Sequence, residues 1–336
     1  MGGGASRPIV IPRALLAADC GSGVGLGHLE RLLALADALA ADMDVSILVP
    51  RGDSSLESRV TDRGHRTIDA SGPTAERVGA AVRSGPTFDV VVLDGYVFPV
   101  DLQRGLRERA ALTVIDDLCL AADCDLAVNP SPGGESLRPS GARAFVGGAS
   151  YALIRRLFLD ARERAQRAGR APRTVLVSTG ATDLGGIGSR VSRELRARDA
   201  AVEVVRVVGP DTIADRPHPQ SRERLLLAPP ELAGALAAAT VYVGAAGTTA
   251  VQAACVGTPA VLTAAVANQT AQAAALAATG CAIAADTDDL TGVCLTLLDD
   301  PQRRDAMAHQ GRSLVDGHGA DRVADAVRHL VSARAA

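Results

Sequence analysis

The stretch Asp19-Cys-Gly-Ser-Gly-Val-Gly-Leu-Gly-His28-Leu-Glu-Arg31 joins a short apolar run, residues 14–18, to a segment with helical spacing. Its four closely spaced glycines allow the backbone to approach a bound group, and the start of the following helix carries partial positive charge. A turn of this kind is typical of a strand-to-helix connection that binds an anion. His28 adds a group that can exchange protons near neutral pH.

The same alternation of strand and helix continues along the chain. Short apolar runs rich in β-branched residues alternate with longer alanine- and leucine-rich segments, which predicts an α/β fold with parallel sheets flanked by helices. Strands are expected at 14–18, 44–49, 90–93, 112–115, 126–128, 174–178, 202–208, 225–227, 241–244, 260–263 and 281–284. Helices are expected at 28–41, 55–63, 100–110, 188–197, 249–255 and 270–278.

The length of 336 residues exceeds one ordinary core and predicts two α/β domains of comparable size. A charged helical connector followed by Ala171-Pro172 indicates the boundary between them. We expect a flexible leader over 1–13, an N-terminal domain over 14–155, a connector over 156–172 and a C-terminal domain over 173–316. The last segment, 317–336, is expected to be a helix that could cross back to the N-terminal domain.

Composition excludes several classes of protein. The formal net charge is −3, from 35 basic and 38 acidic residues without a long run of one sign, so no nucleic-acid partner is expected. All the basic residues are arginine, which excludes a P-loop lysine and a Schiff-base lysine. Six cysteines without metal-ligand spacing indicate reduced thiols in a cytoplasmic protein and no metal site. The uncharged stretch 232–285 is broken by turn residues, so no membrane span is expected. The oligomeric state stays open.

The first turn does not fit the dinucleotide-binding fingerprint, because the third required glycine would fall on Leu26 or His28. No acidic residue ends the second strand, which argues against an NAD-dependent enzyme. His28 at a helix start favours the neutral form that can accept a proton, although a capping or packing histidine explains the position equally well. Asp19 could orient His28 or a substrate hydroxyl, or it could be a turn residue at a strand end.

A second glycine-rich loop, Ser178-Thr-Gly-Ala-Thr-Asp183-Leu-Gly-Gly, also follows a strand and precedes a helix. The amides and hydroxyls of Gly180, Thr182 and Asp183 could surround a diphosphate. A plain turn between strand and helix is the alternative, and the residues alone favour it.

A third loop begins at Gly244-Ala-Ala-Gly247-Thr248-Thr249 and continues to Gln252. Thr248 or Thr249 can cap a helix whose free amides face an anion, and Gly257 is the expected end of that helix. Gln252 lies about one turn further along, within reach of ligand hydroxyls. Helix capping alone does not explain the polar pair Asn268-Gln269, which follows an apolar strand.

Motifs along nearly the whole chain resemble one family. They are Gly-Leu-Gly-His28-Leu-Glu-Arg31, Asp94-Gly-Tyr96, Asp116-Asp117, Cys124-Asp-Leu, Tyr151-Ala-Leu-Ile-Arg155, Ala-Gly-Thr-Thr249, Asn268-Gln269 and the closing Leu314-Val-Asp-Gly-His-Gly-Ala-Asp-Arg322. Together they look like the UDP-sugar hydrolase of the pseudaminic acid pathway. That family is similar in architecture to the lipid-II-forming GlcNAc transferase, with two Rossmann-like domains, parallel sheets and an interdomain cleft, the GT-B arrangement.

The resemblance implies hydrolysis of a nucleotide sugar, with water attacking the anomeric carbon, UDP leaving, and neither metal nor other cofactor required. It implies His28 as the base, with Asp19 and Tyr96 as further catalytic candidates. Substrate-binding candidates are Gly25, Gly27, Arg31, Asp94, Asp117, Asn129, Tyr151 and Arg155. Nucleotide-binding candidates are Gly180, Thr182, Asp183, Gly247, Thr248, Thr249, Gln252, Asn268 and Gln269. A glycosyltransferase of the same fold and a noncatalytic nucleotide-sugar-binding protein are the alternatives.

Three departures from the family pattern point to a different substrate. Ala17 stands where the family commonly has arginine, and Leu120-Ala-Ala-Asp123 replaces a segment that is often basic. Gln252 replaces a glutamate that receives both ribose hydroxyls in the family. Because an amide can accept one hydrogen bond and donate another, a ribose can still bind, but the identity of the nucleotide stays open.

Overall fold

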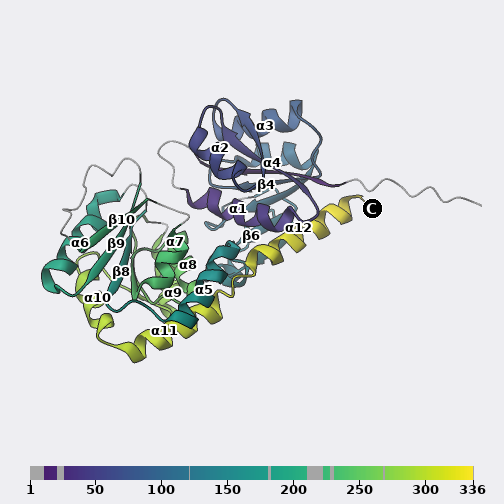
Figure 1. The fold of residues 1–336 in the computed structure, drawn as a ribbon. Coiled ribbons are helices and arrows are strands. Elements are labelled where there is room, and N and C mark those ends of the chain that lie inside the picture. The colour runs from purple at the N-terminus through teal and green to yellow at the C-terminus, as the bar shows by residue number, and fades with distance from the viewer. Residues whose placement is uncertain are drawn as a thin grey trace, which may run out of the picture.

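The computed structural model of the protein describes residues 11–20, 26–120, 122–180, 183–209, 222–227, 231–267 and 269–335. Two separate parallel sheets form the cores of two Rossmann-like domains (Figure 1). This confirms the expected α/β architecture. The exact residue boundaries of the domains stay predictions.

The N-terminal sheet has seven strands in the order β3-β2-β1-β4-β5-β6-β7. The strands are β1 (Arg13–Ala18), β2 (Asp44–Pro50), β3 (Arg66–Ala70), β4 (Val90–Asp94), β5 (Ala111–Ile115), β6 (Leu126–Asn129) and β7 (Ala144–Gly147). Helices α1 (Gly27–Leu39), α2 (Ser54–Thr61), α3 (Thr74–Ser84) and α4 (Val100–Arg107) connect them. Strands β4 and β5 are buried along their whole length, as expected for the centre of a parallel sheet.

The C-terminal sheet has six strands in the order β10-β9-β8-β11-β12-β13. They are β8 (Thr174–Ser178), β9 (Glu203–Val208), β10 (Glu223–Leu227), β11 (Val241–Ala245), β12 (Ala260–Thr263) and β13 (Ala282–Ala284). Its helices are α6 (Ile187–Arg198), α7 (Leu232–Ala238), α8 (Thr248–Val256), α9 (Gln269–Ala278), α10 (Leu290–Leu298) and α11 (Pro301–Leu314). Short 3-10 turns lie at Gly134–Ser136, Ala149–Tyr151 and Leu184–Gly186.

Several of these elements were not expected from the sequence, namely β3, β7, α3, α7, α10 and α11. Strands β3 and β7 form the two edges of their sheet, and most of their residues are partly or fully exposed. Edge strands of this kind lack the continuous apolar run that identifies a central strand. Helices α7 and α10 are apolar on nearly all sides, so helical periodicity does not separate them from buried strands.

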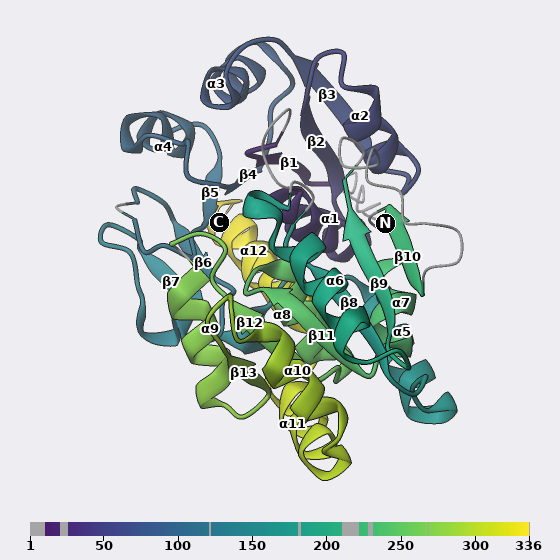
Figure 2. The ribbon, with the colours of Figure 1, turned by 90° about the vertical axis from the view of Figure 1, so that its left-hand side faces the viewer.

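Helix α5 (Arg156–Ala168) packs against α7 and α8 of the C-terminal domain, whereas α12 (Gly319–Ala335) ends beside the N-terminal domain (Figures 1 and 2). Val323 and Val327 of α12 are fully buried in the same core as the leucines of α1. The last helix of the chain therefore completes the core of the first domain. No helix of the described residues combines the length and the apolar character needed to cross a bilayer.

We expect Val327→Ala to lower the stability of the N-terminal domain by about 2 kcal/mol, because it removes buried methyl groups and leaves a cavity against α1. Val331→Ala, one turn later at a partly buried position, is the matched control and should lower the free energy of unfolding by less than Val327→Ala does. Urea denaturation followed by circular dichroism measures both. Equal losses in the two variants would contradict the packing of α12 described above.

Candidate active site

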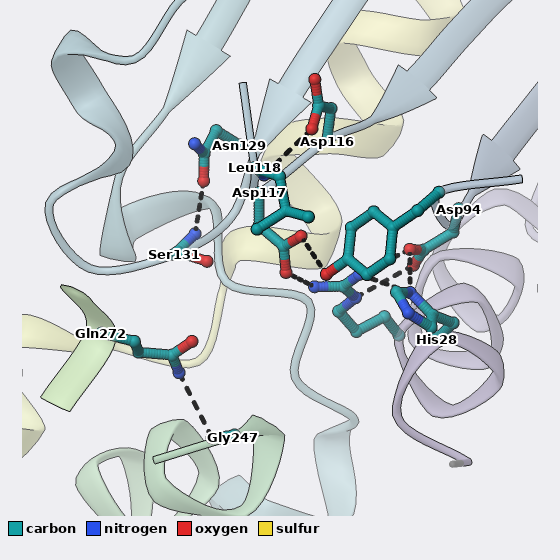
Figure 3. A network of polar contacts seen from close by, with 11 residues as sticks. His28, Asp94, Asp116, Asp117, Leu118, Asn129, Ser131, Gly247 and Gln272 are labelled. Carbon is teal, nitrogen blue, oxygen red and sulfur yellow. Dashed lines mark hydrogen bonds and ion pairs between the residues drawn. The ribbon is translucent and has the colours of Figure 1, made fainter. Parts of the chain in front are cut away.

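Asp94 and Asp117 lie close to His28 where β4 and β5 end and α1 begins (Figure 3). Arg31 of α1 contacts all three side chains. Its guanidinium donates from Nε to Asp94 Oδ2 at 3.0 Å, from Nη2 to Asp94 Oδ1 at 2.5 Å and from Nη1 to Asp117 Oδ2 at 2.6 Å. Burial alone would lower the pKa of Arg31, but the charges of Asp94 and Asp117 outweigh it and raise that pKa. The guanidinium is therefore a permanent cation that fixes two carboxylates.

Asp94 contacts His28, whereas Asp19 does not, and the strand register explains the difference. Asp94 pairs with Ala18 across β4 and β1, and Ala18 packs in the core on the α1 side of the sheet. Because side chains alternate between the faces of a strand, Asp19 points to the opposite face. There its Oδ1 accepts a 3.5 Å hydrogen bond from Thr74 of α3. This corrects the expectation that Asp19 orients His28.

His28 lies with Nδ1 at 2.7 Å from Asp94 Oδ1 and also at 2.7 Å from Arg31 Nη2. Nδ1 can donate to the carboxylate in one tautomer or accept from the guanidinium in the other, but not both. The ring of Tyr96 meets the His28 ring edge-on, with centroids 5.1 Å apart and an interplanar angle of 86°. The ring position is thus held from three sides.

Tyr96 and Asp117 form the exposed side of this network. The Tyr96 hydroxyl donates to Asp117 Oδ1 at 2.6 Å, and burial together with the Asp117 charge raises the pKa of Tyr96. Burial opposes ionisation of Asp117, but the Arg31 charge and the Tyr96 hydrogen bond outweigh it and lower the pKa of that carboxyl. Asp117 is therefore ionised and Tyr96 is neutral throughout the physiological range.

Asn129, at the end of β6, is fully buried, and its Oδ1 accepts from Ser131 N at 3.2 Å (Figure 3). Its Nδ2 has no hydrogen-bond partner within the described part of the chain. A buried donor without a partner costs about 1–3 kcal/mol. Such an atom is a candidate contact for a ligand oxygen.

The C-terminal domain faces this region with the start of α8. Gly247 is the N-cap residue, and among the described residues no side chain caps the helix. Thr248 and Thr249 were expected to cap α8, but they are its first two residues. Gly257 ends the helix in a left-handed conformation with φ of 77°, as expected. Gln272 of α9, which the sequence did not single out, donates to Gly247 O at 3.3 Å (Figure 3).

The two domains meet closely at Gly27 and Thr248. A Cβ at Gly27 would lie 2.9 Å from Thr248 Oγ1, so only glycine fits at this point without a shift. Helix α1 also starts without a side-chain cap in the described chain. The starts of α1 and α8 therefore lie side by side, and both carry partial positive charge.

In the loop after β8, Asp183 binds the backbone and side chains at the start of α6. Asp183 accepts hydrogen bonds from Thr179 Oγ1 at 2.5 Å, Gly188 N at 2.7 Å, Ser189 N at 3.0 Å and Ser189 Oγ at 2.9 Å. Burial opposes ionisation, but these bonds outweigh it and lower the pKa of Asp183. The carboxylate is thus engaged at the start of α6. Gly180 adopts φ of 100°, which glycine tolerates best.

The other predicted site residues are spread more widely. Gln252 of α8 is buried, and its Oε1 has no partner within the described ranges. Gln269 accepts from Ala265 N at 2.9 Å, and its Nε2 lies 3.5 Å from where a Cβ of Gly247 would be. Tyr151 packs against the N-terminal core, and Arg155 pairs with Glu30 at 3.5 Å, so neither joins the Arg31 network. Gly25, Thr182 and Asn268 lie outside the described residues.

Two hollows of the structure lie elsewhere. One of about 1060 Å³ lies between β12, β13, α9 and α10, and one of about 430 Å³ lies between α5, β10 and α7. Neither is lined by the Arg31 network. In the described part of the chain, no three His, Cys, Asp or Glu side chains are arranged to hold a metal ion. Ala17 is fully buried in the sheet core, so the side chain at this position does not face the site.

The fold and this arrangement define a two-domain protein of the GT-B type, and comparison with solved structures agrees. The spinosyn forosaminyltransferase SpnP aligns with a TM-score of 0.69 at 16% identity, over 96% of this chain and 99% of SpnP. MurG of Acinetobacter baumannii aligns with a TM-score of 0.66 at 16% identity, over 95% of this chain and 99% of MurG. SsfS6 of Streptomyces sp. SF2575, a glycosyltransferase solved with thymidine diphosphate, aligns with a TM-score of 0.65 at 16% identity. The alignment covers 95% of this chain and 100% of SsfS6. No family model and no curated protein matches the sequence.

The expectation of a hydrolase is contradicted, because the structures that resemble this chain include the transferases of spinosyn, calicheamicin and kitacinnamycin. The relation to the lipid-II-forming GlcNAc transferase is supported at the level of fold, whereas the relation to the pseudaminic acid pathway is not. The motif around His28 could not separate the two activities. Water and an acceptor hydroxyl are both oxygen nucleophiles that need the same base.

We expect Asp117→Asn to lower the free energy of unfolding at pH 7 by about 2 kcal/mol, since it removes a charged partner of Arg31 and Tyr96. Because the folded pKa of Asp117 is lowered, its contribution is fully present above the ordinary carboxyl pKa of about 4 and is lost as pH falls through the folded value. The difference between variant and wild type should therefore shrink below about pH 4. Urea midpoints measured from pH 3 to pH 7 follow it. Asp101→Asn, at an exposed carboxylate, serves as the control, and a pH-independent difference for Asp117→Asn would contradict the pairing.

Proposed function

We propose that the protein is a glycosyltransferase that moves a sugar from a nucleoside-diphosphate donor to a hydroxyl group of an acceptor. The single observation that carries this proposal is the 2.7 Å contact between His28 Nδ1 and Asp94 Oδ1 at the point where the domains meet. A histidine oriented by a buried carboxylate is an arrangement suited to a general base. The GT-B fold supports the proposal by analogy.

In this proposal Asp94 accepts the Nδ1–H of His28 and leaves Nε2 with a free lone pair. Nε2 then takes the proton of the acceptor hydroxyl as its oxygen attacks the anomeric carbon and the bond from that carbon to the diphosphate breaks. General-base catalysis of this kind typically contributes about 10²- to 10⁴-fold in rate. A single displacement inverts the configuration at the anomeric carbon.

The departing diphosphate is met by helix starts instead of a lysine, which the chain lacks. The starts of α1 and α8 lie side by side at Gly27 and Thr248, and neither is capped by a side chain of the described residues. Their amides and partial charges suit a developing anion. Gln272 and Gln269 lie near Gly247 and would orient the phosphate or sugar oxygens.

The proposed donor contacts use two buried amide atoms that lack partners in the described chain, Asn129 Nδ2 and Gln252 Oε1. Asn129 would donate to a sugar oxygen, and Gln252 would accept from a ribose hydroxyl. Because Gln252 offers a single acceptor oxygen, both uridine and thymidine diphosphate donors fit, and SsfS6 was solved with thymidine diphosphate.

A panel of UDP- and TDP-sugars, incubated with and without acceptor alcohols and analysed by mass spectrometry, tests the proposal. We expect a glycosylated acceptor with one class of donor, and a loss of about 10²- to 10⁴-fold in kcat for His28→Ala with nucleotide binding retained. Asp94→Asn should lose activity in the same direction. His309→Ala, at an exposed histidine of α11, is the control and should keep full activity.

Two results would overturn the proposal. One is release of nucleotide at the same rate with and without an acceptor, and the other is full transferase activity in His28→Ala. Binding of nucleotide sugars without any turnover would point to a noncatalytic binding protein instead.

A further inference from the structure

The exposed apolar side chains of the described residues are not scattered evenly. Of seven large hydrophobic residues that are exposed, four lie on the two loops that follow β4 and β5, and each is 37–44% exposed. They are Tyr96, Val97, Leu118 and Leu120, which we call the acceptor platform. A cluster of exposed apolar side chains marks a binding surface more often than single residues do.

The two loops of the platform are tied together. Strands β4 and β5 are parallel neighbours, with Asp94 opposite Ile115, so both loops leave the same edge of the sheet. The buried side chain of Gln103 donates from Nε2 to Phe98 O at 2.9 Å in the first loop and accepts from Asp123 N at 3.0 Å in the second. The Tyr96 to Asp117 hydrogen bond joins the loops a second time.

Asp116 holds the two leucines in place. It is buried, and its Oδ1 accepts a hydrogen bond from the backbone amide of Leu118 at 3.0 Å, whereas its Oδ2 has no partner among the described residues. Cys119 adopts φ of 56°, a conformation that costs energy for a residue other than glycine. The Asp116 hydrogen bond fixes the loop at Leu118, and the strained backbone at Cys119 follows it, in a conformation in which Leu118 and Leu120 are both exposed.

The arginines described beside the platform are already paired with carboxylates. Asp117 is bound by Arg31 and Tyr96, while Arg104 and Arg107 pair with Asp123, and Arg104 also with Asp101. An anionic membrane surface or a charged ligand would need unpaired cations here. The surroundings therefore suit an uncharged apolar molecule.

The platform is continuous with the proposed base. Tyr96 contacts the His28 ring, and Leu118 is adjacent to Asp117, whose carboxylate is bound to both Tyr96 and Arg31 (Figure 3). A molecule whose hydroxyl reaches His28 from the solvent side of Tyr96 would lay the rest of its body across these four residues.

We propose that the acceptor platform, Tyr96, Val97, Leu118 and Leu120, binds the apolar body of an uncharged small-molecule acceptor and directs its hydroxyl to His28. The proposal rests on the proposed function for the role of the hydroxyl, but the binding of apolar alcohols is measurable without turnover. In this proposal Leu118 and Leu120 determine specificity for the apolar body of the acceptor. Neither contacts His28 or Arg31 in any contact described above, so they can be substituted without changing the proposed base.

The test is calorimetric titration with 4-ethylphenol, 4-butylphenol and 4-hexylphenol. We expect affinity to rise by about two- to fourfold for each added methylene, as for partial to full burial of the chain. 4-(4-Hydroxyphenyl)butanoate, which carries a carboxylate at the end of a chain of similar length, should bind at least about tenfold more weakly than 4-butylphenol, because its charge would be desolvated.

The variants Leu118→Asp and Leu120→Asp should each lose about tenfold or more in affinity for 4-hexylphenol. Ile11→Asp is the matched control, since Ile11 is also exposed but lies before the amino end of β1, whereas the platform loops follow the carboxyl ends of β4 and β5. This variant should bind 4-hexylphenol as wild type does. Leu118→Ser provides a milder variant, and thermal melting shows that each protein is folded.

Two results would overturn the platform. The first is an affinity that does not depend on chain length or on Leu118 and Leu120. The second is cosedimentation with neutral phosphatidylcholine vesicles that Leu118→Asp abolishes and Ile11→Asp does not, without any binding of the phenols, which would make this a membrane-docking surface. Chain-length-dependent binding without transfer from any donor would support the platform and count against the proposed function.

Discussion

The buried pairing of Arg31 with Asp94 and Asp117 is the interaction on which the site depends. One guanidinium satisfies carboxylates from the ends of two neighbouring strands, and each carboxylate then holds a ring, His28 through Asp94 and Tyr96 through Asp117. Removing one member of a buried charge pair leaves the other uncompensated, which is strongly destabilising. The helix, the two strands and the two rings therefore keep one geometry, and His28, the proposed base, is already in place without a bound substrate.

The C-terminal domain contributes the start of α8 to the proposed site. The Arg31 network carries two carboxylates for one guanidinium, so it does not attract a diphosphate by charge. In the proposed function that attraction comes from the uncapped starts of α1, in the N-terminal domain, and α8, in the C-terminal domain, where Gly27 meets Thr248. Helix α12 links the two parts, since it begins after the C-terminal domain and completes the core behind α1. In the proposed function the base lies in the N-terminal domain and the anion lies at helix starts from both domains, which share the packed helix α12.

The sequence predicted the two parallel sheets and most central strands, because fully buried strands such as β4 and β5 are continuous apolar runs. It predicted His28, Arg31, Asp94, Tyr96 and Asp117 as site residues, but it left open whether Asp19 orients His28 or is a turn residue at a strand end. Sequence could not decide this, because the face to which Asp19 points depends on side-chain alternation and on the exact strand end. Gln272 and Gln103 had no signal, because a glutamine on a helix becomes informative only when its neighbours in space are known. The acceptor could not be read from the motif either, since His28 would serve water and an alcohol alike.

In the proposed mechanism Asp94, and not Arg31, sets the tautomer of His28. Nitrogen NMR of protein labelled with ¹⁵N-histidine, with the His28 signals assigned by their loss in His28→Ala, measures this directly. We expect a neutral ring protonated at Nδ1 with an unprotonated Nε2, and a shift toward the tautomer protonated at Nε2 in Asp94→Asn. A neutral ring protonated at Nε2 in the wild-type protein would show that Arg31 donates to Nδ1, and His28 could not then accept a proton through Nε2.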